Sequence, residues 1–136
     1  MEKKLLNKKK KFTNKKEKKV YPQNIIVKIK ALLNNIRIDI TDTNGNVLLW
    51  RTAGTQGMKN SKKSTPFSAL VVSKEVCNQV NTWNVQNCVI QVNGFGAGRE
   101  TALRMLVENF GSKVTYISDT LRLAYNGVRP KKQRRI

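Results

Sequence analysis

A glycine turn within residues 88–110 is the stretch of this chain whose residue types and spacing are best suited to bind a ligand. An apolar run is followed by Gly94, Gly96 and Gly98, and then by Arg99 and the apolar periodicity of an amphipathic helix. Glycines allow a tight passage from strand to helix, and a helix N-terminus presents unpaired N–H groups and a partial positive charge. The turn is therefore suited to bind phosphate, with Arg99 adding charged donors beside it. The alternative is a tight turn that binds nothing.

Several kinds of enzyme site are excluded or disfavoured by the residues present. The Gly-x-Gly-x-Gly spacing differs from the dinucleotide fingerprint Gly-x-Gly-x-x-Gly, and no acidic residue ends a strand about 20 residues later to bind a ribose. Because the chain has no histidine, histidine-based catalysis and histidine metal ligands are excluded. The acidic turn at 42–46 lacks the glycine position and closing glutamate of a calcium loop. Cys77 and Cys88 lie in apolar patterns, which are typical of reduced core cysteines. We therefore expect no cofactor and no metal site.

The charge of the chain, formally +19 over 136 residues, is concentrated at its two ends. Residues 1–20 contain ten lysines and two glutamates, and residues 129–136 contain five basic side chains and no acid, which leaves +6 for the middle. A chain this basic is predicted to bind a polyanion, either nucleic acid or an anionic membrane. No stretch approaches the roughly 18 apolar residues of a membrane span, and neither end has the pattern of an interfacial helix. Nucleic acid is therefore the predicted partner, and a membrane is not.

Residues 1–20 are predicted to form a disordered lysine-rich arm, because the like charges are too dense for independent folding. We expect this arm to become ordered only on a polyanion; the alternative is a tail that only improves solubility. The arm lacks the apolar region of a signal peptide and the arginine and serine bias of an organelle import peptide.

Alternating apolar residues predict three strands at 25–31, 36–41 and 47–52. Turns are expected at Asn34-Asn35 and at residues 42–46, so the three strands should form an antiparallel meander.

Two helices and two further strands follow in the sequence. Pro66 predicts a helix that begins there, is capped by Ser64 or Thr65, and continues to about Trp83. Residues 86–92 predict the fourth strand, the helix after the glycine turn should stop at Gly111, and residues 114–118 predict the last strand. The side chains expected to pack in the core are Phe67, Leu70, Val71, Cys77 and Val80 from the first helix, and Leu103, Leu106, Val107 and Phe110 from the second.

These elements predict an α/β fold: a single domain with a mixed five-stranded sheet, in which a three-stranded antiparallel meander is followed by strand, helix and strand. The final crossover should be right-handed and parallel, and the order resembles a ribonuclease-H-like sheet. With two main helices and basic tails, the predicted organisation is an arm at 1–20, an α/β domain at 21–120 and a basic C-terminal tail at 121–136.

Two further basic segments are suited to contact a sugar–phosphate backbone. Residues 54–64 combine glycines with three lysines and small hydroxyl residues. At the C-terminal end, Asn126 and Gly127 predict a turn, and Pro130 should keep the basic tail extended.

Three motifs are shared with a known family. They are Lys62-Lys63-Ser64-Thr65-Pro66-Phe67-Ser68-Ala69, then Gly94-x-Gly96-x-Gly98-Arg99-Glu100-x-Ala102, and finally Asn126-Gly127-x-Arg129-Pro130-Lys131-Lys132-x-Arg134-Arg135. In their order and spacing the chain resembles, over about residues 25–136, the universal small-subunit ribosomal protein numbered eleven, of the bacterial and organellar type. It departs from the family pattern at Leu32, Leu33, Leu121, Leu123, Tyr125 and Val128, where local RNA contacts are expected to differ.

The resemblance implies a structural protein on the platform of the small ribosomal subunit, bound to small-subunit rRNA near the path by which messenger RNA leaves the decoding region. It implies no catalysis. Neighbouring platform proteins and messenger RNA are the further partners that it suggests. Because the chain is rich in Lys, Asn and Ile, we expect a mitochondrial ribosome, with a plastid or the bacterial cytoplasm as the alternatives.

The predicted function is therefore to bind rRNA and support ribosome assembly and translation. One alternative is a ribonuclease-H-like enzyme that processes nucleic acid, for which Asp39, Asp42, Glu75, Glu100 and Asp119 would have to converge on metal ions. Another is a free basic nucleic-acid-binding protein. The residues predicted to bind rRNA are Asn34, Asn35, Lys59, Ser61, Lys62, Lys63, Ser64, Arg99, Asn126, Gly127, Arg129, Lys131, Lys132, Arg134 and Arg135.

Overall fold

Five strands form one mixed sheet in the computed structural model of the protein, which describes residues 21–129. The strands are β1 (Asn24–Ala31), β2 (Ile36–Asp42), β3 (Val47–Thr52), β4 (Asn87–Asn93) and β5 (Val114–Asp119), in the order β3-β2-β1-β4-β5. The β1–β2 and β2–β3 pairs are antiparallel, whereas the β1–β4 and β4–β5 pairs are parallel. The predicted meander and the parallel pairing after it are confirmed.

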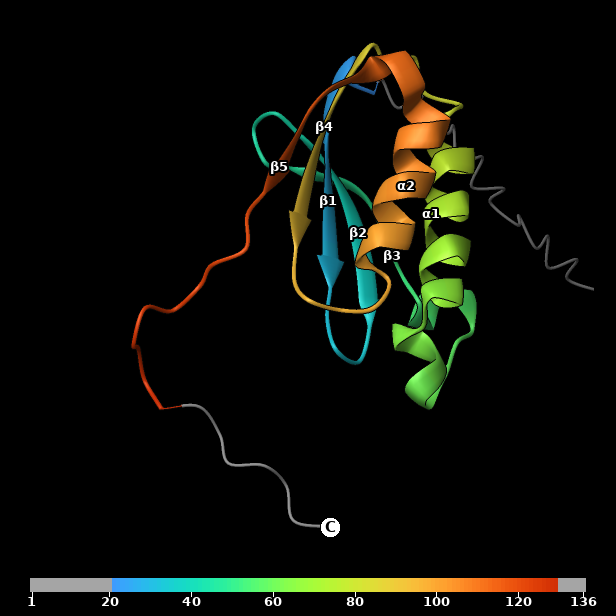
Figure 1. The fold of residues 1–136 in the computed structure, drawn as a ribbon. Coiled ribbons are helices and arrows are strands. Elements are labelled where there is room, and N and C mark those ends of the chain that lie inside the picture. Colours follow the sequence, from blue (N-terminus) through green and yellow to red (C-terminus); the bar gives the residue numbers. More distant parts are fainter. Residues whose placement is uncertain (1–20, 130–136) are drawn as a thin grey trace, which may run out of the picture.

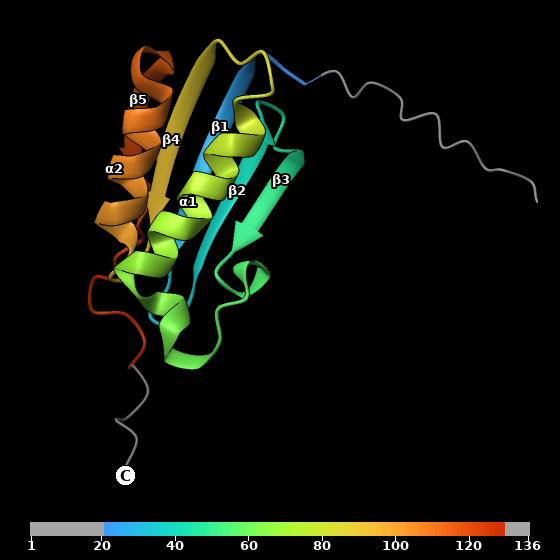
Figure 2. The ribbon, with the colours of Figure 1, turned by 90° about the vertical axis from the view of Figure 1, so that its right-hand side faces the viewer.

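Two helices cover one face of this sheet, as Figures 1 and 2 show together. They are α1 (Pro66–Val80) and α2 (Arg99–Phe110), and they pack against each other as well as against the sheet. Three short 3-10 helices complete the described part: η1 (Gly54–Gln56), η2 (Asn60–Ser64) and η3 (Gly111–Lys113). The predicted single α/β domain, with a mixed five-stranded sheet and two main helices, is confirmed.

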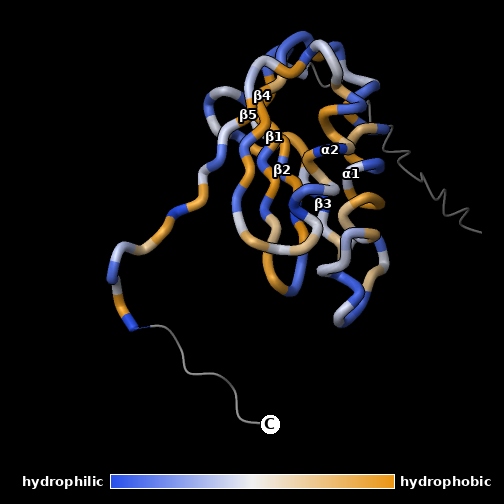
Figure 3. The backbone as a smooth tube through the Cα atoms, in the orientation of Figure 1, coloured by the Kyte–Doolittle hydropathy of each residue, from blue (hydrophilic) through white to orange (hydrophobic). Residues whose placement is uncertain are grey.

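The core lies between the helices and the helix-facing side of the sheet. In β1, Ile25, Val27, Ile29 and Ala31 are buried, as the alternation predicts, and β2 contributes three isoleucines at every second position. Figure 3 shows apolar segments along these strands. Both cysteines are unpaired and buried in this core, which confirms the predicted reduced core cysteines.

The start of α1 follows the predicted capping chemistry, but its end and its buried face differ from the prediction. The Thr65 hydroxyl accepts a hydrogen bond from the Ser68 N–H, and Pro66 occupies the first turn. The helix ends at Val80 instead of Trp83, because Asn81 caps it and the Trp83 ring turns inward to stack on Tyr21, with ring centroids 4.0 Å apart.

Phe67 was predicted to be in the core, and this is wrong: the side chain is 65% exposed. The buried stripe of α1 passes instead through Ala69, Val72 and Val76. Phe67 precedes Ala69 by two residues, or about 200° around the helix axis, so its side chain projects away from the sheet. In α2, the prediction is confirmed for Leu106 and Phe110, which are buried, and the remaining two residues, Leu103 and Val107, pack against the core while partly exposed.

Candidate nucleic-acid interface

One end of the domain collects segments that are far apart in the sequence. The C-terminal ends of the parallel strands β1, β4 and β5 lie there, together with the N-termini of α1 and α2 (Figure 1). We call this the loop end, and it comprises residues 32–35, 54–65, 94–98 and 120–129. Because every rRNA-binding residue predicted within the described part belongs to these segments or borders them, the fold brings the predicted site residues to one end of the molecule.

The glycine turn, residues 94–98, is packed directly on the end of β1. The N–H of Gly96 donates to the carbonyl oxygen of Ala31 over 2.9 Å. A Cβ at Gly94 would overlap the carbonyl oxygen of Ala31, and a Cβ at Gly96 would overlap that of Leu32; each would also lie 2.9 Å from the carbonyl carbon of Ala31. Gly94 also has a positive φ of 97°, which favours glycine. Close packing therefore accounts for these glycines whether or not the turn binds phosphate.

Gly98 closes the turn against α1. A Cβ there would lie 2.7 Å from the Ala69 Cβ, and the carbonyl oxygen of Thr65 is 3.7 Å from the same point. The N-termini of the two helices are therefore held side by side at the loop end. Both carry the partial positive charge of a helix start.

Arg99, which the sequence predicts to add charged donors to the turn, is itself engaged by the surrounding protein. Its side chain is only 23% exposed, and its guanidinium donates to the carbonyl oxygen of Gly94 over 2.9 Å and to the Asp119 carboxylate over 2.6 Å. Arg99 thus connects the glycine turn to the end of β5, where the C-terminal segment leaves the sheet.

Asp119 is the residue at this site that sequence reasoning missed. Its carboxylate accepts the Leu121 N–H over 3.0 Å in addition to the Arg99 guanidinium, and these two hydrogen bonds lower the pKa of Asp119 below its ordinary value. The strand order predicted from the sequence could have indicated this residue, because parallel pairing of β4 and β5 places the last residue of β5 beside the turn that follows β4. An acid there faces the first residue of α2.

The basic segment 59–64, which is part of the stretch predicted to contact a sugar–phosphate backbone, lies largely in the 3-10 helix η2. Its geometry is held by hydroxyl groups: Ser64 donates to the carbonyl of Ser61, Thr65 to that of Lys62, and Ser68 to that of Lys63. Among residues 21–129, no carboxylate forms an ion pair with Lys59, Lys62 or Lys63. Lys59, Ser61 and Lys62 are exposed, whereas Lys63 and Ser64 are half-buried. The segment therefore presents cationic groups on an ordered turn.

The β1–β2 turn contains Asn34 and Asn35 next to two exposed leucines. The Leu32 N–H donates to the carbonyl oxygen of Asn35 over 2.9 Å, which closes the turn. Asn34 is exposed, and the buried Oδ1 of Asn35 has no hydrogen-bond partner within residues 21–129. Leu32 and Leu33 are 56% and 78% exposed, so this turn has apolar as well as polar surface.

Residues 120–129 leave the sheet at the loop end in an extended course (Figure 1). The segment is anchored where Thr120 donates its N–H to the carbonyl of Val92 over 2.9 Å. A bend occurs at the predicted position, but Asn126, with φ 50°, adopts the left-handed conformation, and Gly127 does not. Arg129 is exposed. The other predicted tail residues, Lys131, Lys132, Arg134 and Arg135, lie outside the described residues, as does the arm at 1–20.

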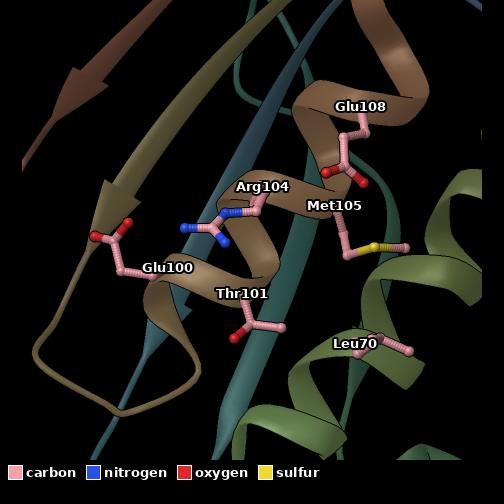
Figure 4. A pocket seen from close by; sticks show the side chains of 6 residues that line it. All are labelled: Leu70, Glu100, Thr101, Arg104, Met105 and Glu108. Carbon is pink, nitrogen blue, oxygen red and sulfur yellow. The ribbon is translucent and has the colours of Figure 1, made fainter.

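The carboxylates that a two-metal nuclease would need are spread over the molecule. Asp39 lies on the helix-free face of the sheet, Asp42 begins the β2–β3 turn, Glu75 is on α1, and Asp119 pairs with Arg99. Glu100 is at the start of α2; Figure 4 shows its side chain pointing away from α1, whereas Met105 of the same helix turns toward Leu70 of α1. Within the described part of the chain, no three His, Cys, Asp or Glu side chains are grouped as metal ligands. These carboxylates therefore do not converge in the way that the two-metal alternative requires.

No helix among residues 21–129 has the length and apolar character needed to cross a membrane.

Comparison with known proteins gives one consistent match. The model of a family described as ribosomal protein S11 matches residues 25–135. The small ribosomal subunit protein uS11 of Aliarcobacter butzleri is 40% identical over 122 residues, which cover 88% of this chain and 94% of the relative. That of Helicobacter acinonychis is 43% identical over 123 residues, with the same coverage. That of Burkholderia cenocepacia is 44% identical over 111 residues, which cover 82% of this chain and 83% of the relative.

Proposed function

Because this chain belongs to the ribosomal protein S11 family, and is therefore a structural component of the small ribosomal subunit and not an enzyme, we propose that it binds small-subunit rRNA through its loop end. The binding surface consists of the β1–β2 turn, the basic segment 59–64, the glycine turn and the tail that begins at Asn126. The proposed location is the platform of the subunit, near the path by which messenger RNA leaves the decoding region. There the protein supports assembly and translation.

The observation that carries this proposal is the packing of the first two shared motifs against each other, beside the strand β5 from which the segment leading to the third motif departs. These motifs are separated by many residues in the sequence, yet the Gly98 position lies against Thr65 and Ala69 of the first motif, and Arg99 connects the second motif to the root of the tail. An RNA backbone that crosses this end would meet two helix N-termini and exposed lysines together. Phosphate binding is the chemistry that these groups share.

We propose different roles for the two basic ends of the chain. The arm at 1–20 contributes diffuse, sequence-independent affinity through its lysines. The tail leaves the domain from an anchored strand, and its arginines can stack on bases and donate two parallel hydrogen bonds to a phosphate, which lysines cannot do. The tail is therefore the specific docking element.

Charge-conserving substitutions test this division. Replacing Arg129, Arg134 and Arg135 with lysine keeps the net charge, and we expect reduced incorporation of the tagged protein into small subunits. The matched control replaces Lys8, Lys9 and Lys10 of the arm with arginine and should incorporate normally. Normal incorporation of the tail variant would overturn the specific role of the tail. Crosslinking in cell extract, followed by sequencing of the attached RNA, tests the proposal as a whole, because it should recover small-subunit rRNA.

Further partners and the compartment follow from the same proposal. Neighbouring proteins of the platform would contact the sides of the domain that rRNA leaves uncovered, and messenger RNA would pass nearby. The relatives reported above are bacterial, whereas the richness in lysine, asparagine and isoleucine favours a mitochondrial ribosome. Fractionation of the source cells, with the protein detected in purified organelles or in the cytosol, would decide between these compartments.

A further inference from the structure

The face of the sheet opposite the helices is uncovered within residues 21–129 (Figures 1 and 2). The strand register defines what it presents. One row across the strands consists of Thr52, Arg37, Lys30 and Asn93, and the next consists of Trp50, Asp39, Lys28, Gln91 and Ser118. We call these two rows the open face. The first row borders the loop end, so the open face continues the proposed rRNA surface onto the sheet.

The open face is positively charged and its charges are fixed in place. Three cations, Lys28, Lys30 and Arg37, surround a single acid, Asp39. The Nε of Arg37 donates to Asp39 Oδ1 over 2.6 Å, and the Nζ of Lys30 lies 3.7 Å from Asp39 Oδ2. The Asp39 side chain is only 5% exposed, whereas those of Lys30 and Arg37 are 50% and 44% exposed. The carboxylate is thus beneath the surface, and the cations are presented above it.

Aromatic side chains flank these cations on the two edge strands. Trp50 on β3 is 48% exposed, and the Arg37 guanidinium lies 5.8 Å from its ring centroid. Tyr116 on β5 is 56% exposed and pairs with Val89 in the next row of the same face. Four strand spacings separate β3 from β5, which is about 19 Å. A few nucleotides of a single strand can span that distance.

We propose that the open face binds single-stranded RNA, with a base stacked on Trp50 and phosphates bound by Lys28, Lys30 and Arg37. Exposed aromatic rings interleaved with cations on an uncovered sheet suit unpaired bases, whose faces are free to stack. The bases of a duplex are already stacked on one another and cannot reach the rings. Trp50 and Arg37 are residue types that protein interfaces also use, but Lys28 and Lys30 at the centre of the face favour RNA, because the cores of protein interfaces are depleted in lysine. This inference goes beyond the proposed function, which requires only the loop end.

Tryptophan fluorescence of the full-length protein gives a local test, because the two tryptophans differ in environment. Trp83 is 8% exposed and stacks on Tyr21, so quenching by added RNA reports on Trp50. We expect a single-stranded uridine 12-mer to quench the emission in a saturable way, and a 12-base-pair RNA duplex to bind without quenching. Trp50→Phe should abolish the quenching while binding, followed by fluorescence anisotropy of a labelled 12-mer, persists through the basic ends of the chain.

A pair of charge-matched double variants tests the role of the cations. Lys28→Gln with Lys30→Gln should weaken the quenching titration about 25-fold at 0.1 M salt and lower the salt slope by about 1.4, since each phosphate contact on a single strand contributes about 0.7. Lys74→Gln with Arg104→Gln removes the same charge from exposed positions on the helices and should leave the titration unchanged. Lys28→Arg with Lys30→Arg should retain quenching, which separates loss of binding from loss of folding.

Two results would overturn the inference. One is an absence of quenching by the single strand at concentrations where anisotropy shows that it is bound. The other is an equal effect of the two charge-removing variants. Either result would leave the proposed function intact if the variants of the open face still enter small subunits, because that function depends on the loop end.

Discussion

Replacing Gly94 with alanine should destabilise the domain far more than the same change at Gly45. Both glycines have strongly positive φ values, 97° and 90°, so an alanine at either position adopts an unfavourable backbone conformation. Their surroundings differ. A Cβ at Gly94 would overlap the carbonyl oxygen of Ala31, whereas nothing lies within 4 Å of a Cβ at Gly45 in the β2–β3 turn. The pair of variants therefore isolates the close approach of the glycine turn to β1.

The expected magnitudes follow from these two contributions. The left-handed conformation costs alanine about 1–2 kcal/mol at both positions. Overpacking against the β1 backbone adds about 1–3 kcal/mol at Gly94 alone, because a main-chain carbonyl in a paired strand cannot rotate away as a side chain can. We therefore expect Gly94→Ala to lower the free energy of unfolding by about 2–5 kcal/mol and Gly45→Ala by about 1–2 kcal/mol.

Urea unfolding, followed by tryptophan fluorescence and extrapolated linearly to water, measures both values. If the two variants lose the same stability, then close packing on β1 is not the reason for glycine at position 94. The interpretation of the turn as a phosphate-binding loop, in which the backbone itself must approach the ligand, would then be favoured. A larger loss for Gly94→Ala than for Gly45→Ala supports the packing argument.

Three further predictions concern the charges and the thiols. Removing residues 1–19 should leave the domain folded and weaken binding to rRNA and to unrelated RNA alike. The binding constant should also depend less steeply on salt concentration. An unchanged salt dependence would show that the arm does not contact phosphate. The folded pKa of Asp119 is lowered from 3.8, so the ionised carboxylate stabilises the fold above that pH, and this contribution is lost as the pH falls through the folded pKa. The difference in Tm between the wild type and Asp119→Asn should therefore shrink below about pH 4. A constant difference would contradict this. Burial raises the pKa of Cys77 to about 11 and that of Cys88 to about 12. Iodoacetamide at pH 8 should therefore label neither thiol in the native protein and both thiols in urea. Rapid labelling of the native protein would refute the assigned burial.

The sequence alone was sufficient for most of the local structure and for the family. Alternation at 25–31 and 36–41 predicted strands whose apolar side faces the core, because the side-chain period of two is a property of the backbone itself. Thr65 and Pro66 predicted the start of α1, because capping depends on residues only three positions apart. The end of α1 and the exposure of Phe67 could not be predicted in the same way. Both depend on how the helix is rotated against the sheet and on the Tyr21–Trp83 stack, which joins residues far apart in the sequence.

Only the tertiary structure decided what the charged side chains contact. Arg99 was predicted to add charged donors to a phosphate-binding turn, and only the fold shows that it also pairs with Asp119, because parallel pairing of β4 and β5 places the end of β5 beside the start of α2. Lys28, Lys30 and Arg37 are unremarkable as separate polar positions in the sequence. They become one cationic surface because strand order and register place them in adjacent rows, and because both helices pack on the opposite side. Local patterns fix which side of an element is apolar, whereas contacts between distant segments depend on strand order and packing, which no local pattern encodes.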